Sequence, residues 1–238
     1  MVMRHGDMGR AQELECVVHR IGEAGHAADI RTFADTLCSN RMMRRRRRRP
    51  VRLPFWSLDG GRDERKPQTY WFRDDGLIPN HPKWPFIFYK SASRLPKSLD
   101  PAAVFEELFA SNGWVDSWRD GIYDYVHYHS RIHEVLGSAR GSAKVQFGGP
   151  KGRILILKQA DVAILPAGTG HQCLKAGEDF LVVGAYPPSG TYDECTSLDD
   201  RKEALRTIRR VARPRKDTGY GKDGALTRAW YKPDRRRS

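Results

Sequence analysis

Residues 121–141 read GIYDYVHYHSRIHEVLGSARG, and this stretch carries the strongest indication of the fold. His127 and His129 are two positions apart, so on a strand their imidazoles would point to the same face. Glu134 follows a polar pair, where a bend would start a neighbouring strand and bring its carboxylate alongside the imidazoles. The stretch therefore predicts two histidines and one acid on a single face of a β structure.

A third histidine lies downstream, where the stretch PAGTGH forms a tight turn that ends at His171. Three neutral imidazoles and one carboxylate that converge in the mouth of a barrel suit a divalent first-row metal. An octahedral ion held by four protein ligands keeps two positions open for water, O₂ or a bidentate substrate. We therefore expect metal chemistry in this part of the chain.

Short apolar runs, separated by glycine, proline and polar turns, fill residues 121–187. Short strands at this regular spacing are typical of a β-sandwich or barrel. The chain shows no internal repeat, so we expect this β unit once. The expected strands cover residues 134–136, 143–147, 154–157, 162–165 and 180–185.

Other elements flank this β unit. Residues 69–72 read as a first strand, and three prolines between 79 and 85 favour an irregular path after it. Asp100 can cap a helix whose first position suits Pro101. A last helix is expected over residues 198–211, because a serine precedes it and acidic residues occupy its first turn.

The two histidine stretches resemble the two sequence motifs of the cupin superfamily. Residues 121–141 match the first motif, G-x5-H-x-H-x4-E-x6-G, at every specified position. Residues 161–171 resemble the second, G-D-x4-P-x-G-x2-H-x3-N, with Ala160 in place of its glycine and Lys175 in place of its asparagine. The wider text over residues 68–231 is similar to the YjlB-like branch of single-domain cupins.

This resemblance implies a mainly β fold, the double-stranded β-helix or jelly-roll barrel, with flanking helices. It also implies one divalent transition metal, Mn, Fe, Ni or Zn, held by His127, His129, Glu134 and His171. Cupins include dioxygenases, decarboxylases, isomerases, storage proteins and ligand-binding regulators. We expect a small-molecule metalloenzyme, and the alternative is a non-catalytic module that binds or senses a small ligand through the metal.

Tyr123 and Tyr125 share the parity of His127, so both are expected to face the barrel interior. Tyr125 could hydrogen-bond a substrate or a metal-bound water, and core packing is the alternative for both tyrosines. Glu134 could also leave the metal and act as a base. Tyr125 and Glu134 are therefore the catalytic candidates.

Cys173 shares the parity of His171 and is a candidate for the pocket wall, although packing is the expected role of such a thiol. Gln146 is a candidate for orienting a metal ligand by contacting that ligand without itself binding the metal. His133 is adjacent to Glu134 and should face the opposite way on a strand.

The 238-residue chain has a formal net charge of +13, and its basic residues are concentrated at the two ends. Residues 67–200 hold 13 Lys and Arg against 16 Asp and Glu. Residues 1–66, with an arginine run at 44–49, read as a basic, largely disordered extension, and residues 67–238 as the cupin domain. The run lacks the interleaved aromatics of a stacking groove, so nucleic acid is not the expected partner.

No stretch approaches the roughly 18 consecutive apolar residues of a transmembrane helix. The four cysteines show no C-x-x-C spacing and read as free thiols of a reducing compartment, so we expect a cytoplasmic protein. Single-barrel cupins resemble one another in pairing, so we expect a homodimer that binds a small molecule.

Overall fold

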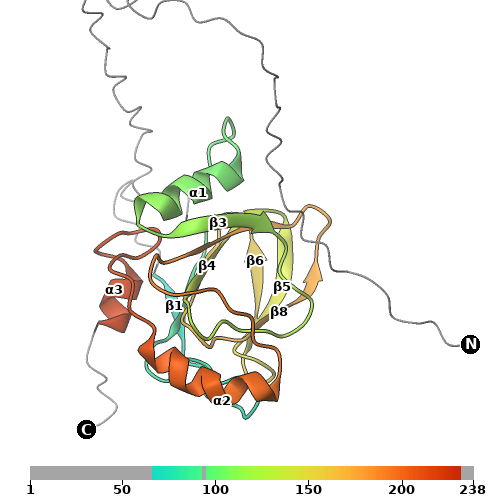
Figure 1. Ribbon diagram of the computed structural model, residues 1–238. Coiled ribbons are helices and arrows are strands. Elements are labelled where there is room, and N and C mark those ends of the chain that lie inside the picture. Colours follow the sequence, from blue (N-terminus) through green and yellow to red (C-terminus); the bar gives the residue numbers. More distant parts are fainter. Residues whose placement is uncertain (1–65, 93–94, 232–238) are drawn as a thin grey trace, which may run out of the picture. The chain divides into compact units, whose positions relative to one another are not determined.

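A computed structural model of the protein describes residues 66–92 and 95–231. Short strands dominate this part of the chain, and helices follow or interrupt them (Figure 1). The elements are β1 (Gln68–Tyr70), β2 (Phe86–Tyr89), α1 (Pro101–Ser111), β3 (Val115–Asp120), β4 (Glu134–Arg140), β5 (Ser142–Phe147), β6 (Arg153–Lys158), β7 (Val162–Leu165), β8 (His171–Ala176), β9 (Leu181–Tyr186), α2 (Leu198–Thr207), the 3₁₀ turn η1 (Ile208–Arg210) and α3 (Ala225–Trp230).

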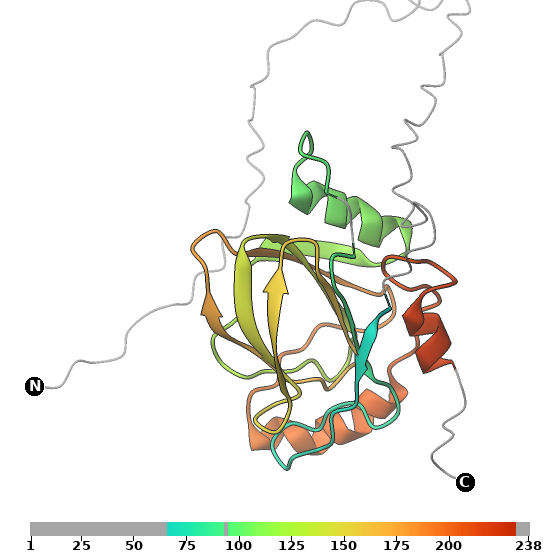
Figure 2. The ribbon, with the colours of Figure 1, turned by 180° about the vertical axis from the view of Figure 1, so that it is seen from behind.

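The strands form two antiparallel sheets. The larger has the order β1-β2-β7-β4-β9-β3, and the smaller has the order β6-β5-β8. Figure 2 shows the smaller sheet facing the larger one, which closes a barrel-like core between them. The expectation of a mainly β jelly-roll fold with flanking helices is confirmed.

The core between the sheets follows the two-residue period of the strands. Alternate residues of β2, β4, β5 and β7 point into it, because successive side chains on a strand face opposite ways. Burying these apolar side chains is the main stabilising contribution to the barrel. The buried residues of this cluster are Phe86, Phe88, Leu136, Ala143, Val145, Phe147, Leu157, Ala163, Leu165, Cys173 and Val182.

Helices cover the outer face of the larger sheet, so its central strands are buried on both sides. Phe105 and Phe109 of α1 pack there beside Trp230 of α3. Gly137 of β4 allows this approach, because a Cβ at that position would lie 2.6 Å from the Phe105 ring. The continuous apolar runs in β4, β7 and β9 therefore reflect burial on two faces.

The helix signals in the sequence are confirmed at two sites. Asp100 accepts a hydrogen bond from the backbone N–H of Ala102 at the start of α1. Ser197 and Asp200 form a reciprocal capping box at the start of α2. Figures 1 and 2 place α1 and α2 on opposite sides of the barrel.

The sheets are wider than the expected strand region 121–187, because β1, β2 and β3 precede it and belong to the larger sheet. The short β2 follows the prolines directly and pairs with β7 on one side and β1 on the other. The expected first strand at 69–72 is observed as β1, whereas β2, β3 and β8, which starts at His171, were not predicted. The apolar residues of β8 are interrupted by Gln172 and Lys175, so its sequence lacks an apolar run.

The expected last helix, 198–211, is observed as α2 followed by η1, and it is not the last helix. The six-residue α3 lies beyond it and is held by tertiary contacts. Trp230 donates from its indole nitrogen to the Pro85 carbonyl, and Asp217 accepts from the Leu226 N–H. A helix this short has little stability of its own, which explains why the sequence pattern did not reveal it.

The predicted basic extension, 1–66, lies outside the described residues except for Lys66, as do Cys16, Cys38 and the arginine run. Cys173 and Cys195 are free thiols and are buried. Within the described part of the chain, no helix combines the length and apolar character needed to cross a bilayer.

Candidate metal centre

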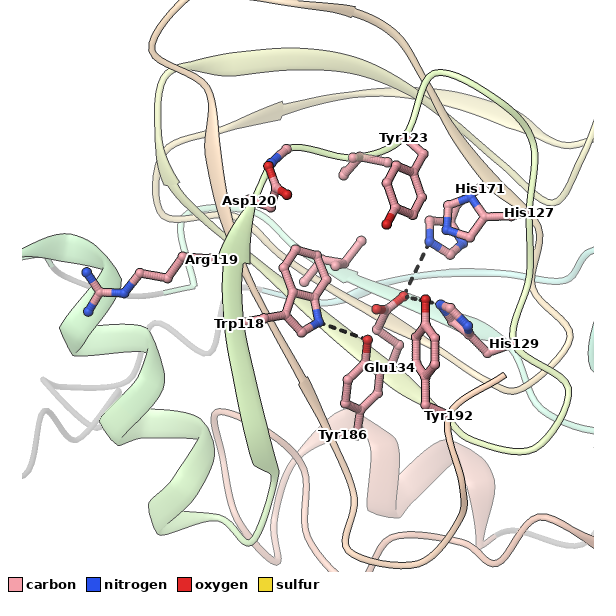
Figure 3. Close-up of a pocket in the computed structure, with 13 residues that line it drawn as sticks. Trp118, Arg119, Asp120, Tyr123, His127, His129, Glu134, His171, Tyr186 and Tyr192 are labelled. Carbon is pink, nitrogen blue, oxygen red and sulfur yellow. Dashed lines mark hydrogen bonds and ion pairs between the residues drawn. The ribbon is translucent and has the colours of Figure 1, made fainter. Parts of the chain in front are cut away.

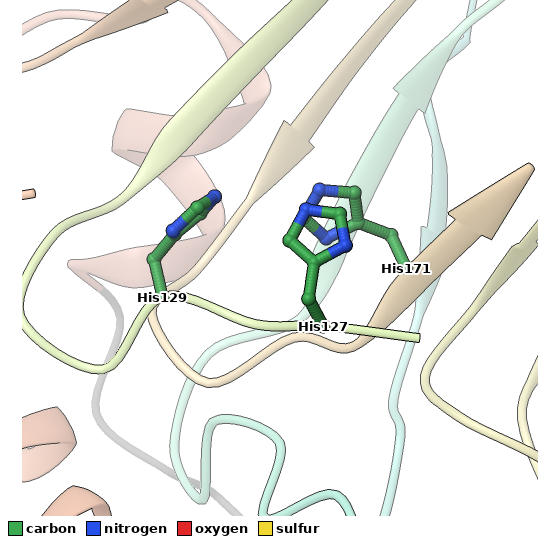
Figure 4. A group of neighbouring side chains, drawn as sticks. All are labelled: His127, His129 and His171. Carbon is green, nitrogen blue, oxygen red and sulfur yellow. The ribbon is translucent and has the colours of Figure 1, made fainter. Parts of the chain in front are cut away.

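Three histidines from two distant segments meet at one end of the barrel. His127 and His171 pair through two backbone hydrogen bonds, from the His127 N–H to the His171 carbonyl and back. His129 lies two residues further on and points the same way, as the alternation predicts. One ring nitrogen from each histidine lies within 4.8 Å of the other two (Figure 4).

Glu134 is the first residue of β4, and its carboxylate faces two of these imidazoles. Its Oε2 lies 3.3 Å from Nε2 of His171 and 3.5 Å from Nε2 of His129 (Figure 3). All four side chains are buried, with exposed fractions of 2% to 5%. The four residues that were expected as ligands are therefore brought together by the fold.

These residues fit a divalent cation. Glu134 Oε2 is buried and has no hydrogen-bond partner among the described residues. An unpartnered buried carboxylate oxygen is costly unless a charge compensates it. Imidazole nitrogens and a carboxylate oxygen are the donors that Mn, Fe, Ni and Zn share.

Backbone carbonyls orient each imidazole. Nδ1 of His127 faces the Tyr125 carbonyl at 3.3 Å, and Nδ1 of His171 faces the Thr169 carbonyl at the same distance. Nδ1 of His129 faces the Asp193 carbonyl at 2.5 Å. Since a carbonyl only accepts, each Nδ1 carries the proton, and each Nε2 is left with a lone pair.

The acid–base properties of the cluster favour metal ligation. Burial raises the pKa of Glu134, but the imidazoles of His129, His171 and His127 outweigh this effect and lower it to about 2. Burial lowers the pKa of His171 to about 3 and also lowers that of His127. Burial opposes protonation of His129 too, but the Glu134 carboxylate raises its pKa to about 8. Glu134, His127 and His171 are therefore in the states that bind metal at neutral pH, whereas His129 must release a proton when a metal binds.

A cavity of about 400 Å³ opens above these four residues. Aromatic side chains form part of its walls, and Figure 3 shows Tyr123 and Tyr192 beside the histidines and Tyr186 beside Trp118. The lining residues are Trp118, Arg119, Asp120, Gly121, Ile122, Tyr123, His127, His129, Glu134, Leu136, His171, Tyr186 and Tyr192.

Two aromatic residues of the wall are linked to each other. The indole Nε1 of Trp118 on β3 donates to the hydroxyl of Tyr186 at the end of β9, at 2.8 Å. Burial and the nearby Glu134 carboxylate raise the pKa of Tyr186 above its ordinary value. The Tyr186 hydroxyl therefore keeps its proton, which it can donate to Glu134 or into the cavity.

Tyr192 lines the cavity beside His129. Its ring centre lies 4.9 Å from that of His129, and its hydroxyl donates to Glu194 at 3.1 Å. Asp193, the next residue, holds the segment after His129. Its carboxylate accepts from the N–H and hydroxyl of Ser130 and from the N–H of Arg131.

The two tyrosines that were expected in the pocket occupy different positions relative to the cavity. Tyr123 lines the cavity, but it is 49% exposed rather than interior. Tyr125 does not line it, and its hydroxyl donates to Glu194 at the surface. The pocket expectation is met by Tyr123 and is wrong for Tyr125, because the residues between β3 and His127 form no strand whose alternation would place both alike.

Gln146 and Cys173 also lie away from the cavity. Gln146 is on β5 between Val145 and Phe147, which both point into the core, so its side chain faces the other side of the sheet. The suggestion that it orients a ligand is therefore wrong. Cys173 packs in the core between the sheets.

His133 faces away from the centre, as its position beside Glu134 predicts. It is completely buried, and its Nδ1 accepts from the Ala167 N–H at 2.8 Å. Its ring packs against Trp84 and Trp230.

Sequence reasoning missed Trp118, Tyr186, Tyr192 and Asp193. None of them has a fixed spacing to the histidines, because they come from β3, β9 and the segment after β9. The one available signal was the stretch VGAYP at 183–187, which belongs to the text similar to YjlB-like cupins and contains Tyr186.

Comparisons with known proteins come from sequences and from solved structures. The protein YjlB of Bacillus subtilis strain 168 is 41% identical over 170 residues, which cover 71% of this chain and 99% of that relative. No family model matches the chain.

Two solved structures illustrate the structural likeness. Acireductone dioxygenase from Bacillus anthracis, solved with cadmium in its active centre, gives a TM-score of 0.33 at 14% identity, over 44% of this chain and 80% of that chain. A variant of oxalate decarboxylase from Bacillus subtilis gives 0.30 at 17% identity, over 50% of this chain and 29% of that chain. Given the 41% identity to YjlB over nearly its whole length, the chain belongs to the YjlB-like branch of the cupin superfamily.

Proposed function

We propose that the chain is a metal-dependent enzyme of the dioxygenase, decarboxylase or isomerase type, acting on a small molecule in the cavity. The observation that carries this proposal is the buried, unpartnered Oε2 of Glu134, which faces Nε2 of His129 and His171 beneath a cavity of about 400 Å³. A structural site would be closed, whereas these side chains border open space.

His127, His129, His171 and Glu134 would hold one divalent ion, which when bound would supply Lewis acidity to the ligand. The chain's own residues have separate parts. The backbone carbonyls behind the imidazoles fix their tautomers, and the Tyr186 hydroxyl offers a proton donor at the wall. A ligand that covers the aromatic walls would displace water from the cavity, which would strengthen its polar contacts there.

Elemental analysis of the purified protein tests this proposal. We expect about one equivalent of Mn, Fe, Ni or Zn after reconstitution, and a large loss in His127→Ala and His171→Ala. His81→Gln is the matched control, because His81 is also a buried histidine but lies outside the cluster. Equal metal content in the wild-type protein and both cluster variants would contradict the proposal.

Turnover separates the enzyme from the alternative. Metal-dependent consumption of a small substrate, or of O₂, supports an enzyme. Stoichiometric metal and ligand binding without turnover would instead assign a non-catalytic binding or sensing module. That alternative uses the same four ligands, so the metal assay alone does not separate the two.

We also propose that the protein acts as a homodimer in the reducing cytoplasm. The two described cysteines are buried free thiols, which suits a reducing compartment. Light scattering coupled to size exclusion tests the dimer, and a monomer at micromolar concentration would contradict it.

A further inference from the structure

Among the described residues, the cavity offers an incoming ligand no lysine or arginine charge. Arg119 is the one Lys or Arg among the described residues that line it. Its guanidinium is turned toward α1, where it donates to Glu106 at 2.6 and 2.7 Å and to Asp100 at 2.7 Å (Figure 3). Arg119 therefore borders the cavity without presenting its charge to it.

Apart from Arg119 and the histidines, the charged side chains that border the cavity are acids. Glu134 lies on its floor, and Asp120 lies at the end of β3 on its edge. A ligand carboxylate or phosphate away from the metal position would meet these acids without a cationic side chain to compensate. Such an arrangement disfavours anions, because like charges at short range repel each other. No lysine or arginine forms an ion pair that would offset the free energy needed to remove water from the anion.

The walls suit a flat ring. Tyr123 and Tyr192 are each 49% exposed, so both have ring surface that a ligand can cover. Tyr123 is supported from behind by Tyr125, whose ring is stacked on it at 4.9 Å with 13° between the planes. Tyr192 lies on His129. Aromatic rings held in place in this way gain from stacking or edge contact with a planar ligand.

The hydroxyl groups of the walls favour a ligand that itself carries hydroxyl groups. The Tyr186 oxygen accepts from the Trp118 indole, and its own proton can turn to the Glu134 carboxylate or to a ligand oxygen. The Tyr123 hydroxyl lines the cavity, while Asp120 and Glu134 only accept when ionised. A ligand hydroxyl can satisfy both kinds of group, because it donates and accepts.

We infer, building on the proposed function, that the cavity takes an uncharged planar ring bearing adjacent hydroxyl groups, and discriminates against carboxylates of the same size. Catechol represents the favoured class, and salicylate is the matched anion. Both are single rings with two adjacent oxygen-bearing groups, and salicylate carries a carboxylate where catechol carries a hydroxyl.

Calorimetric titration of the full zinc-loaded chain with catechol and with salicylate tests the inference. We expect catechol to bind at least about tenfold more tightly, the factor that corresponds to 1.4 kcal/mol. Zinc content is measured before and after each titration, so removal of the metal by the ligand is detected directly. Salicylate binding equal to or tighter than catechol would overturn the inference.

Three variants locate the binding. Tyr123→Ala and Tyr192→Ala should each weaken catechol binding by about threefold to tenfold, because each removes one wall ring. Arg206→Gln should leave both affinities unchanged, since Arg206 is an exposed arginine of α2 that does not line the cavity. Weaker catechol binding in Arg206→Gln, or unchanged catechol binding in both tyrosine variants, would contradict this account.

The metal measurement keeps the two proposals separate. If the protein takes up no stoichiometric metal, the proposed function fails, whatever the ligand preference. If zinc is stoichiometric but salicylate is preferred, only the inference about the ligand class fails. Circular dichroism of each variant identifies a folding defect, and in that case the comparison of catechol with salicylate on the wild-type protein decides.

Discussion

Nδ1 of His129 donates a hydrogen bond to the backbone carbonyl of Asp193, 64 residues further along the chain. The same aspartate accepts, through its carboxylate, from the two residues that follow His129. One residue thus fixes both the ring orientation of a metal ligand and the backbone that carries it. Groups behind the ligands in this way commonly govern metal affinity.

The first prediction concerns this support. Asp193→Ala should weaken metal affinity by about tenfold to a hundredfold, because the backbone after His129 loses three hydrogen bonds. Competition with a chromophoric chelator measures the affinity. Glu194→Gln is the control, since Glu194 accepts only from two tyrosine hydroxyls at the surface. Equal affinity in Asp193→Ala and the wild-type protein would contradict this role.

The second prediction concerns the contact of Trp118 with Gly184. A Cβ at position 184 would lie 2.0 to 2.4 Å from atoms of the indole, so Gly184→Ala must displace Trp118 and break its bond to Tyr186. We expect a loss of about 1 to 3 kcal/mol in the free energy of unfolding and a change in tryptophan fluorescence.

Gly177→Ala is the matched control for this change. A Cβ there would meet its nearest atoms at 3.5 Å, an ordinary contact. Equal stability of the two alanine variants in denaturant titration would contradict the claim that the close packing of Trp118 on β9 requires a glycine at position 184.

The third prediction concerns pH. Burial and the charge of Lys83 lower the pKa of His81 to about 3, and its Nδ1 accepts from two backbone N–H groups. In the unfolded chain the pKa is about 6.5. Below that pH the unfolded state binds a proton that the folded state excludes, so stability falls as the pH falls from about 6.5 toward 3.

At pH 5 this effect amounts to about 2 kcal/mol. His81→Gln removes the titration, so between pH 7.5 and pH 5 the variant should lose about 2 kcal/mol less stability than the wild-type protein. Urea denaturation at the two pH values measures the difference. Parallel losses in the two proteins would show that His81 is not excluded from protonation in the folded state.

The sequence predicted that the four candidate metal ligands lie together because their arrangement depends on local rules. His127 and His129 share a face through the two-residue alternation, and Glu134 begins the strand that follows the bend. The turn before His171 has the glycine and proline that a tight turn requires. Each of these features acts over a few residues.

The cavity walls could not be predicted in the same way. Trp118 borders the cavity only because β3 pairs with β9, and Tyr192 does so because the segment after β9 returns over His129. These are tertiary pairings with no local pattern. The prediction for Tyr125 was wrong for a different reason. It assumed the alternation of side chains on a strand, but the residues around Tyr125 form no strand.

Anomalous diffraction at the metal edge, from crystals of the metal-loaded protein, tests the central claim most directly. We predict one strong peak, about 2.0 to 2.2 Å from Nε2 of His127, His129 and His171 and from the Glu134 carboxylate. A fully loaded protein whose peak lies elsewhere, or contacts fewer than three of these side chains, would contradict the account.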